Sequence, residues 1–156
     1  MTGFQKGSRS DAHAPARLLL AFLFLAFSSS ASAQRTATVT VIGLDYAFQA
    51  PATLPAGLTA FAFENHGKVR HELAMLRLKA GVTLDSLMHV IDSPPARRAL
   101  TEGVGLLFSE AGQTSLGRLL VELTPGRTYV VFCNFQDAPD KPRHMMIGMV
   151  ASLQVK

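Results

Sequence analysis

Apolar and polar residues alternate over several short stretches of the chain. In residues 36–42, alanine and valine take every second position, and threonine takes most of the positions between them. A period of two with β-branched residues is typical of a strand that buries one face. Residues 127–135 are apolar on both faces, which predicts a strand at the centre of a sheet. Further strands are predicted over the ranges 57–65, 71–78, 115–123 and 147–155.

One stretch follows a helical period instead. In LDSLMHVI, residues 84–91, the apolar positions recur at the spacing of one helix face, and Thr83 precedes them as an N-cap. Pro94 and Pro95 are expected to end this helix. A second short helix is expected over residues 97–101, followed by a glycine-containing loop.

Turn signals separate the predicted strands. Pro125 and Gly126 predict a type II turn in which the glycine takes a positive φ. Six to eight short strands with turns between them, and one helical insertion, indicate an all-β fold. The pattern favours a β-sandwich or a β-barrel.

The first 33 residues have the three parts of a secretory signal peptide in order. Three basic residues precede an apolar run of ten residues, 18–27, and the small residues 31–33 offer a cleavage site. The apolar run is too short to span a bilayer, which takes about 20 residues. We expect cleavage to leave residues 34–156 as one domain with no membrane span, secreted across the inner membrane to the periplasm or the cell exterior. An uncleaved membrane anchor is the alternative.

The charge of the predicted mature domain is close to neutral. Residues 34–156 keep 12 basic and 10 acidic side chains, which gives a net charge of +2. This balance gives no reason to expect a nucleic-acid or membrane partner. We expect a monomer.

Cys133 is the only cysteine of the 156 residues. One cysteine cannot form an internal disulfide, and a free thiol in an oxidising compartment is a liability unless it is buried or bound. His144 and Met149 follow it in the same C-terminal stretch. A type 1 copper site takes two imidazoles and a thiolate in a plane, with a weak axial methionine. His71, at the start of a predicted strand, is the candidate for the second imidazole.

Three stretches resemble the cupredoxins, the family of blue-copper proteins that includes plastocyanin and azurin. FENHGKVRHELAML, residues 63–76, resembles the region of their first ligand histidine, where an Asn-x-Gly loop precedes the ligand. RTYVVFCNF, residues 127–135, followed by HMMIGMVASLQV, residues 144–155, resembles their final hairpin, with a cysteine and then His-x4-Met. The stretch 41–63 resembles the first strands of the bacterial exported branch.

The resemblance covers nearly all of residues 34–156, with 82–111 as an insertion. It implies a cupredoxin-like Greek-key β-sandwich that carries one copper ion in a type 1 site. The implied ligands are His71, Cys133, His144 and Met149. The implied function is single-electron transfer with a redox partner protein that the sequence does not identify.

Two features depart from the family pattern. Ten residues, 134–143, separate Cys133 from His144, whereas well-known blue-copper proteins have two to about five. A longer loop still allows the ligands to meet, because the entropy of closing a loop grows only logarithmically with its length. Glu72 stands where many cupredoxins have an asparagine that ties the ligand loops together.

Other interpretations start from the same residues. Met145 and Met146 extend His144 and Met149 into a His/Met cluster, and thioethers favour Cu(I), so a copper chaperone is one alternative. A cupredoxin fold that has lost its metal is another. His66 is a further candidate ligand, with a solvated loop position as the alternative.

An enzyme is not expected. A Cys/His pair can act as nucleophile and base, but the chain has no third orienting residue in a recognisable context, no phosphate-binding loop and no nucleophile elbow. Asp137 and Asp140 lie in the 134–143 loop without a second pair of carboxylates.

Overall fold

The computed structural model describes residues 1–3 and 36–156. The predicted signal peptide and its cleavage site therefore fall almost wholly outside the described residues. Residues 36–156 belong to one compact unit. None of the helices within the described ranges is long and apolar enough to cross a membrane.

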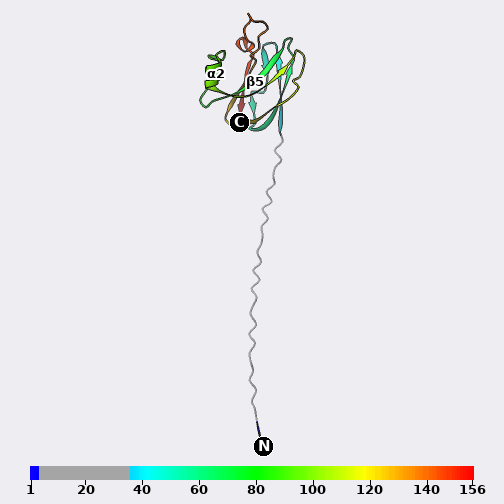
Figure 1. Ribbon diagram of the computed structural model, residues 1–156, viewed down its shortest axis with the longest axis vertical. Helices are drawn as coiled ribbons and strands as arrows, with labels where there is room; N and C mark the ends of the chain where they lie inside the picture. The colour runs from blue at the N-terminus through cyan, green and yellow to red at the C-terminus, as the bar shows by residue number, and fades with distance from the viewer. Residues whose placement is uncertain (4–35) are drawn as a thin grey trace. The chain divides into compact units, whose positions relative to one another are not determined.

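The described domain is a sandwich of two β-sheets (Figure 1). Each sheet is mixed, because β1 runs parallel to β4 in one and β3 runs parallel to β9 in the other. The first sheet has the order β2 (Ala47–Gln49), β1 (Ala37–Leu44), β4 (Gly57–Asn65) and β7 (Leu119–Leu123). The second has the order β3 (Thr53–Leu54), β9 (Val150–Val155), β8 (Thr128–Phe132), β5 (His71–Leu78) and β6 (Thr101–Ser109).

Alternation along the strands produces the core between the sheets. Phe61 and Phe63 of β4 are 0% exposed, and Leu73 and Met75 of β5 belong to the same buried cluster. Burying a side chain of this size contributes about 1.5–3 kcal/mol relative to leaving it in water. The predicted ranges 57–65 and 71–78 coincide with β4 and β5, so the period-two pattern located the two strands that form much of this core.

The helical region begins as predicted and continues differently. The Thr83 side chain caps α1 (Leu84–Met88) by accepting a hydrogen bond from the Ser86 N–H at 3.1 Å. The prediction that two prolines end the helical segment is wrong, because Pro94 and Pro95 begin α2 (Pro94–Leu100). Proline suits the first turn of a helix, where its missing N–H would have no partner within the helix.

Strand β6 replaces the loop predicted after the second helix. It pairs with β5 along its whole length, from His71 opposite Ser109 to Leu78 opposite Thr101. The helical part of the predicted insertion therefore lies within residues 84–100. Gly105 weakens the strand pattern. A Cβ at this position would lie 2.5 Å from Leu119 Cδ1 of the other sheet, so the Leu119 side chain would have to shift. The glycine leaves room for the Leu119 side chain at this point.

The remaining strand ends shift by a few residues. Strand β7 begins at Leu119, and β8 ends at Phe132, one residue before the cysteine. Residues of the 3-10 turn η1 (His144–Ile147) precede the last strand, which begins at Val150 and not at the predicted residue 147. Gly126 has a φ of 73°, as the predicted turn requires.

Candidate metal centre

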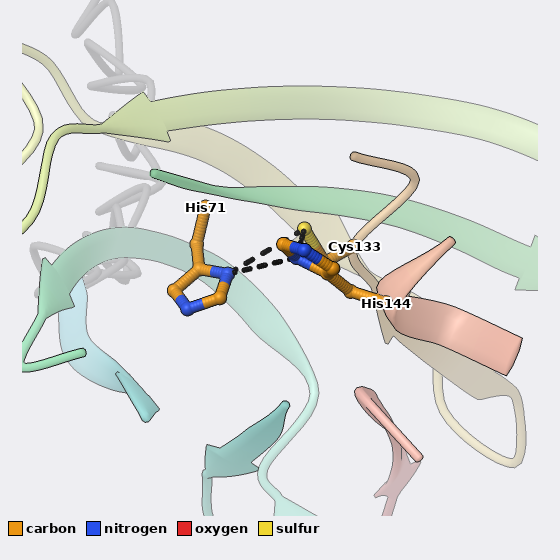
Figure 2. Close-up of side chains that lie close together, drawn as sticks. All are labelled: His71, Cys133 and His144. Atoms are coloured by element: carbon orange, nitrogen blue, oxygen red, sulfur yellow. Dashed lines mark hydrogen bonds between the residues drawn. The ribbon is translucent and has the colours of Figure 1, made fainter. Parts of the chain in front are cut away.

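Three of the predicted ligands converge on one point. His71, Cys133 and His144 are 0%, 0% and 1% exposed, and one donor atom from each lies within 4.8 Å of the others. Figure 2 shows both rings directing a nitrogen toward the sulfur. The two Nδ1 atoms are 3.1 Å apart, and Cys133 Sγ lies 3.4 Å from Nδ1 of His144 and 3.8 Å from Nδ1 of His71.

The pairing of β5 with β8 brings the first two donors together. These strands are antiparallel neighbours, and Ala74 lies opposite Phe132. The start of β5, which carries His71, therefore lies beside the end of β8, which Cys133 follows. The Glu72 N–H donates to Cys133 Sγ at 3.4 Å. A backbone donor of this kind stabilises negative charge on the sulfur.

Backbone hydrogen bonds bring the third donor back despite the ten-residue loop. The His144 N–H donates to the Phe135 carbonyl at 2.7 Å, and the Met145 N–H donates to the Cys133 carbonyl at 2.8 Å. The loop between Cys133 and His144 is thus closed at its base by main-chain contacts. The expectation that its length allows the ligands to meet is confirmed.

Met149 is held by main-chain hydrogen bonds at the base of the same loop. Its carbonyl accepts from the Cys133 N–H at 3.1 Å, and its N–H donates to the His144 carbonyl at 3.0 Å. The side chain is 0% exposed and extends toward Gly43 of β1, where a Cβ would lie 3.5 Å from the methionine methyl. Its role as an axial ligand stays a prediction.

The three donors fit a type 1 copper site. A point in their plane lies about 2.0 Å from each of the three atoms, which matches a metal–nitrogen bond and is about 0.3 Å shorter than a metal–sulfur bond. Two imidazoles and one thiolate in a trigonal plane are the donor set that such copper sites use. The residues present therefore suit copper in number, type and spacing.

Burial affects the protonation of two donors. It lowers the pKa of His71, with the neighbouring His144 as the second cause. It also raises the pKa of the Cys133 thiol. A neutral imidazole is ready to bind a metal, whereas the thiol must lose its proton to a metal that binds.

One buried ring nitrogen is left without a hydrogen-bond partner among the described residues. His71 Nε2 has none, and the closest carboxylate oxygen, Asp45 Oδ1, is 3.7 Å away. A metal on Nδ1 would place the ring proton on Nε2, where it would face Asp45 Oδ1. Gly67 permits the approach, since a Cβ there would lie 2.5 Å from Asp45 Oδ1 and 2.9 Å from His71 Nε2.

Asp137 and Tyr46 also belong to the site, and sequence reasoning gave them no role. His144 Nε2 lies 2.9 Å from Asp137 Oδ1, and the Tyr46 hydroxyl donates to Asp137 Oδ2 at 2.6 Å. The hydrogen bond from Tyr46 lowers the pKa of Asp137. Tyr46 and Asp137 are 91 positions apart in the chain. The one signal in the sequence was an aspartate inside the loop that links two predicted ligands.

Glu72 links the ligand segments although it replaces the expected asparagine. Its Oε1 accepts from the Asn134 N–H at 2.9 Å, and burial raises its pKa. Asn65 supports the other side of the site. Its amide donates to the Val69 and Ser109 carbonyls, and its oxygen accepts from the Gly67 N–H.

The other candidate residues lie apart from the three donors. The side chain of His66 is 53% exposed and contacts Glu64. Met145 is buried in a second apolar cluster together with Leu87 of α1, while Met146 is 49% exposed. The methionines beside His144 thus point into different surroundings and do not form one thioether cluster.

No protein-family model and no curated protein matches the chain. Among solved structures, dithionite-reduced auracyanin from Roseiflexus castenholzii has a TM-score of 0.51 and 15% identity, and the match covers 78% of this chain and 98% of that one. Auracyanin A, a "blue" copper protein from Chloroflexus aurantiacus, has a TM-score of 0.49 and 18% identity, with 78% and 100% covered. Reduced rusticyanin has a TM-score of 0.48 and 23% identity, with 78% and 81% covered.

At these identities the similarity concerns the fold. The chain has the cupredoxin fold, and the predicted all-β sandwich is confirmed.

Proposed function

We propose that this protein binds one copper ion in a type 1 site and transfers single electrons. The observation that carries the proposal is the position of the three buried donors around one point about 2.0 Å from each. Met149, buried at the same base, is the proposed weak axial ligand. The cupredoxin fold supports the proposal, because auracyanin, which has been solved in its dithionite-reduced form, shares it.

Copper would supply a change of one electron between Cu(II) and Cu(I), and the chain would keep the ligands nearly fixed. The donor residues are held by main-chain contacts from three segments: the start of β5, the end of β8 and the η1 turn. Their burial keeps bulk water away from the donors. A rigid, dry site changes little between two oxidation states, so little reorganisation opposes electron transfer.

We further propose that the protein works after export, in the periplasm or outside the cell, with a redox protein as partner. The signal-like pattern of residues 1–33 supports export. The solitary thiol agrees with it, because Cys133 is 0% exposed and its proposed metal would protect the sulfur from oxidation.

The test is the colour of the purified protein after addition of Cu(II). We expect one equivalent of copper to bind with an intense visible band from thiolate-to-copper charge transfer. Cys133→Ser should abolish the band, and His66→Gln, which changes an exposed histidine outside the site, should keep it. A protein that binds Cu(I) tightly and gives no such band with Cu(II), or that binds only a spectroscopically silent ion such as Zn²⁺, would contradict the proposal.

A further inference from the structure

We propose that Asp137, held by Tyr46, is a positioning residue that keeps the His144 ring in the orientation and tautomer required for metal binding. This inference rests on the proposed copper site. The inference starts from a difference between the two histidines. In both rings the inward nitrogen, Nδ1, faces Cys133 Sγ, whereas the outward nitrogen, Nε2, has a hydrogen-bond partner among the described residues only in His144.

The outward nitrogen of His144 has a close carboxylate partner. Asp137 Oδ1 lies 2.9 Å from Nε2, a normal hydrogen-bond distance. A carboxylate accepts and does not donate, so this contact places the ring proton on Nε2. In the neutral ring Nδ1 then carries no proton, and it is the atom that lies 3.4 Å from Cys133 Sγ.

Tyr46 fixes the carboxylate in turn. Its hydroxyl donates to Asp137 Oδ2 at 2.6 Å, so each carboxylate oxygen has its own donor. The Tyr46 ring also lies edge-on to His144, with centroids 5.0 Å apart and an angle of 75° between the planes. Tyr46 has a φ of 63°, which is uncommon for a residue other than glycine and occurs most often where the surroundings demand it.

The outward nitrogen of His71 lacks this support. Asp45 Oδ1 is 3.7 Å from it, beyond hydrogen-bond distance, and is itself engaged by the Lys68 N–H at 2.7 Å. Asp45 and Tyr46 are consecutive residues of the turn between β1 and β2. One turn thus approaches both histidines, but only His144 is held by a complete chain of hydrogen bonds.

This arrangement gives the long loop a role in positioning His144. The loop 134–143 has ten residues where well-known blue-copper proteins have two to about five, and it supplies Asp137. The side chain of Asp137 is 34% exposed, whereas that of His144 is 1% exposed. The loop therefore covers the outward edge of the histidine and places a negative charge against it. Such a charge favours Cu(II) over Cu(I), since it stabilises the higher charge of the ion.

The experiment compares four variants of the full chain. Asp137→Ala removes both the bond and the charge, and Asp137→Asn keeps an acceptor oxygen but removes the charge. Tyr46→Phe removes only the hydroxyl that holds the carboxylate. Asp140→Asn is the matched control, because it makes the same charge change at an exposed position of the same loop.

Three readouts separate positioning from general stability. Nitrogen NMR of the metal-free protein should show the proton of His144 on Nε2 in the wild type and a mixture of tautomers in Asp137→Ala. Cu(II) affinity should fall about 10–100-fold in Asp137→Ala, as for other carboxylate partners of ligand histidines, and less in Tyr46→Phe. If Cu(I) affinity is unchanged, each tenfold loss raises the reduction potential by about 59 mV. Asp137→Asn should raise the potential while keeping the tautomer.

The outcomes also distinguish this inference from the proposed function. If the wild type shows no visible copper band, the proposed function is refuted. The tautomer measurement then still decides whether Asp137 positions His144. A coloured wild type whose potential and tautomer are the same in Asp137→Ala and Asp140→Asn overturns the inference and leaves the copper site standing.

Discussion

Asn65 offers the sharpest test of how the fold supports the site. Its side chain is 0% exposed and makes three hydrogen bonds at the end of β4. The amide donates to the Val69 carbonyl at 2.8 Å and to the Ser109 carbonyl at 3.1 Å, and the oxygen accepts from the Gly67 N–H at 2.9 Å. It thereby ties the loop before His71 to strand β6.

The effect of Asn65→Ala follows from the surroundings of the three partners. The bond to the Ser109 carbonyl is buried, so its loss leaves an unpaired acceptor, which costs about 1–3 kcal/mol. The other two bonds are only partly buried, water can replace them, and each contributes about 0.5–1 kcal/mol. We expect a total loss of about 2–5 kcal/mol from the free energy of unfolding.

Urea unfolding of the metal-free protein measures this loss. With a slope of about 1.5 kcal/mol per molar urea, the midpoint should fall by about 1.3–3.3 M. Asn65→Asp should be no better than Asn65→Ala, because a carboxylate keeps the Gly67 contact but faces two carbonyls without donors. Glu64→Ala, on the same strand, should change the free energy by less than about 0.5 kcal/mol. A loss below about 1 kcal/mol for Asn65→Ala, or an aspartate variant as stable as the wild type, would refute the reasoning.

Three further predictions use other parts of the domain. Gly67→Ala should lower copper affinity and destabilise the fold by about 1–3 kcal/mol, because the new methyl group would clash with Asp45 and His71. Gly117→Ala is the control: its methyl group would meet nothing within 4 Å, so the copper titration and the melting temperature should stay unchanged. Leu87→Ala should cost about 2–4 kcal/mol in urea unfolding, since this 0% exposed side chain anchors α1 to the second apolar cluster. Glu102 has its pKa lowered by a hydrogen bond from the arginine opposite it on β5, so it stabilises the fold above pH 4.5 and loses this effect as the pH falls. Glu102→Gln should therefore show a smaller drop in urea midpoint than the wild type below pH 4.5, and an equal drop would count against the pair.

Part of the fold was predictable because its signal is local. Residues 57–65 and 71–78 alternate at period two, and both ranges agree with strands β4 and β5. Strand β6 was harder to predict, because Gly105 interrupts the period-two pattern and its contact with Leu119 of the other sheet is visible only in the tertiary structure. The prediction for Pro94 was wrong because proline breaks a helix at an interior position but suits the first turn of a new one. The local sequence alone is compatible with both positions.

The residues of the site also fall into a group that the sequence could predict and a group that it could not. The chemistry of thiolate and imidazole, together with the family resemblance, was enough to select His71, Cys133 and His144, and the structure brings these three together. Tyr46 and Asp137 were out of reach, because their contact joins a turn and a loop 91 positions apart. No periodicity or short motif reports a contact of that kind.

Both departures from the family pattern have a structural counterpart at the site. Glu72 replaces an asparagine, yet its carboxylate accepts the Asn134 N–H and so joins the two ligand segments. The ten-residue loop breaks the usual spacing, yet the Met145 N–H returns to the Cys133 carbonyl and closes it. The spacing between ligands is thus a consequence of loop length, which can vary, whereas the main-chain contacts at the ends of β8 and η1 fix where the donors lie. A search for related sites should therefore weigh the strand-end cysteine and the His-x4-Met turn above the number of residues between them.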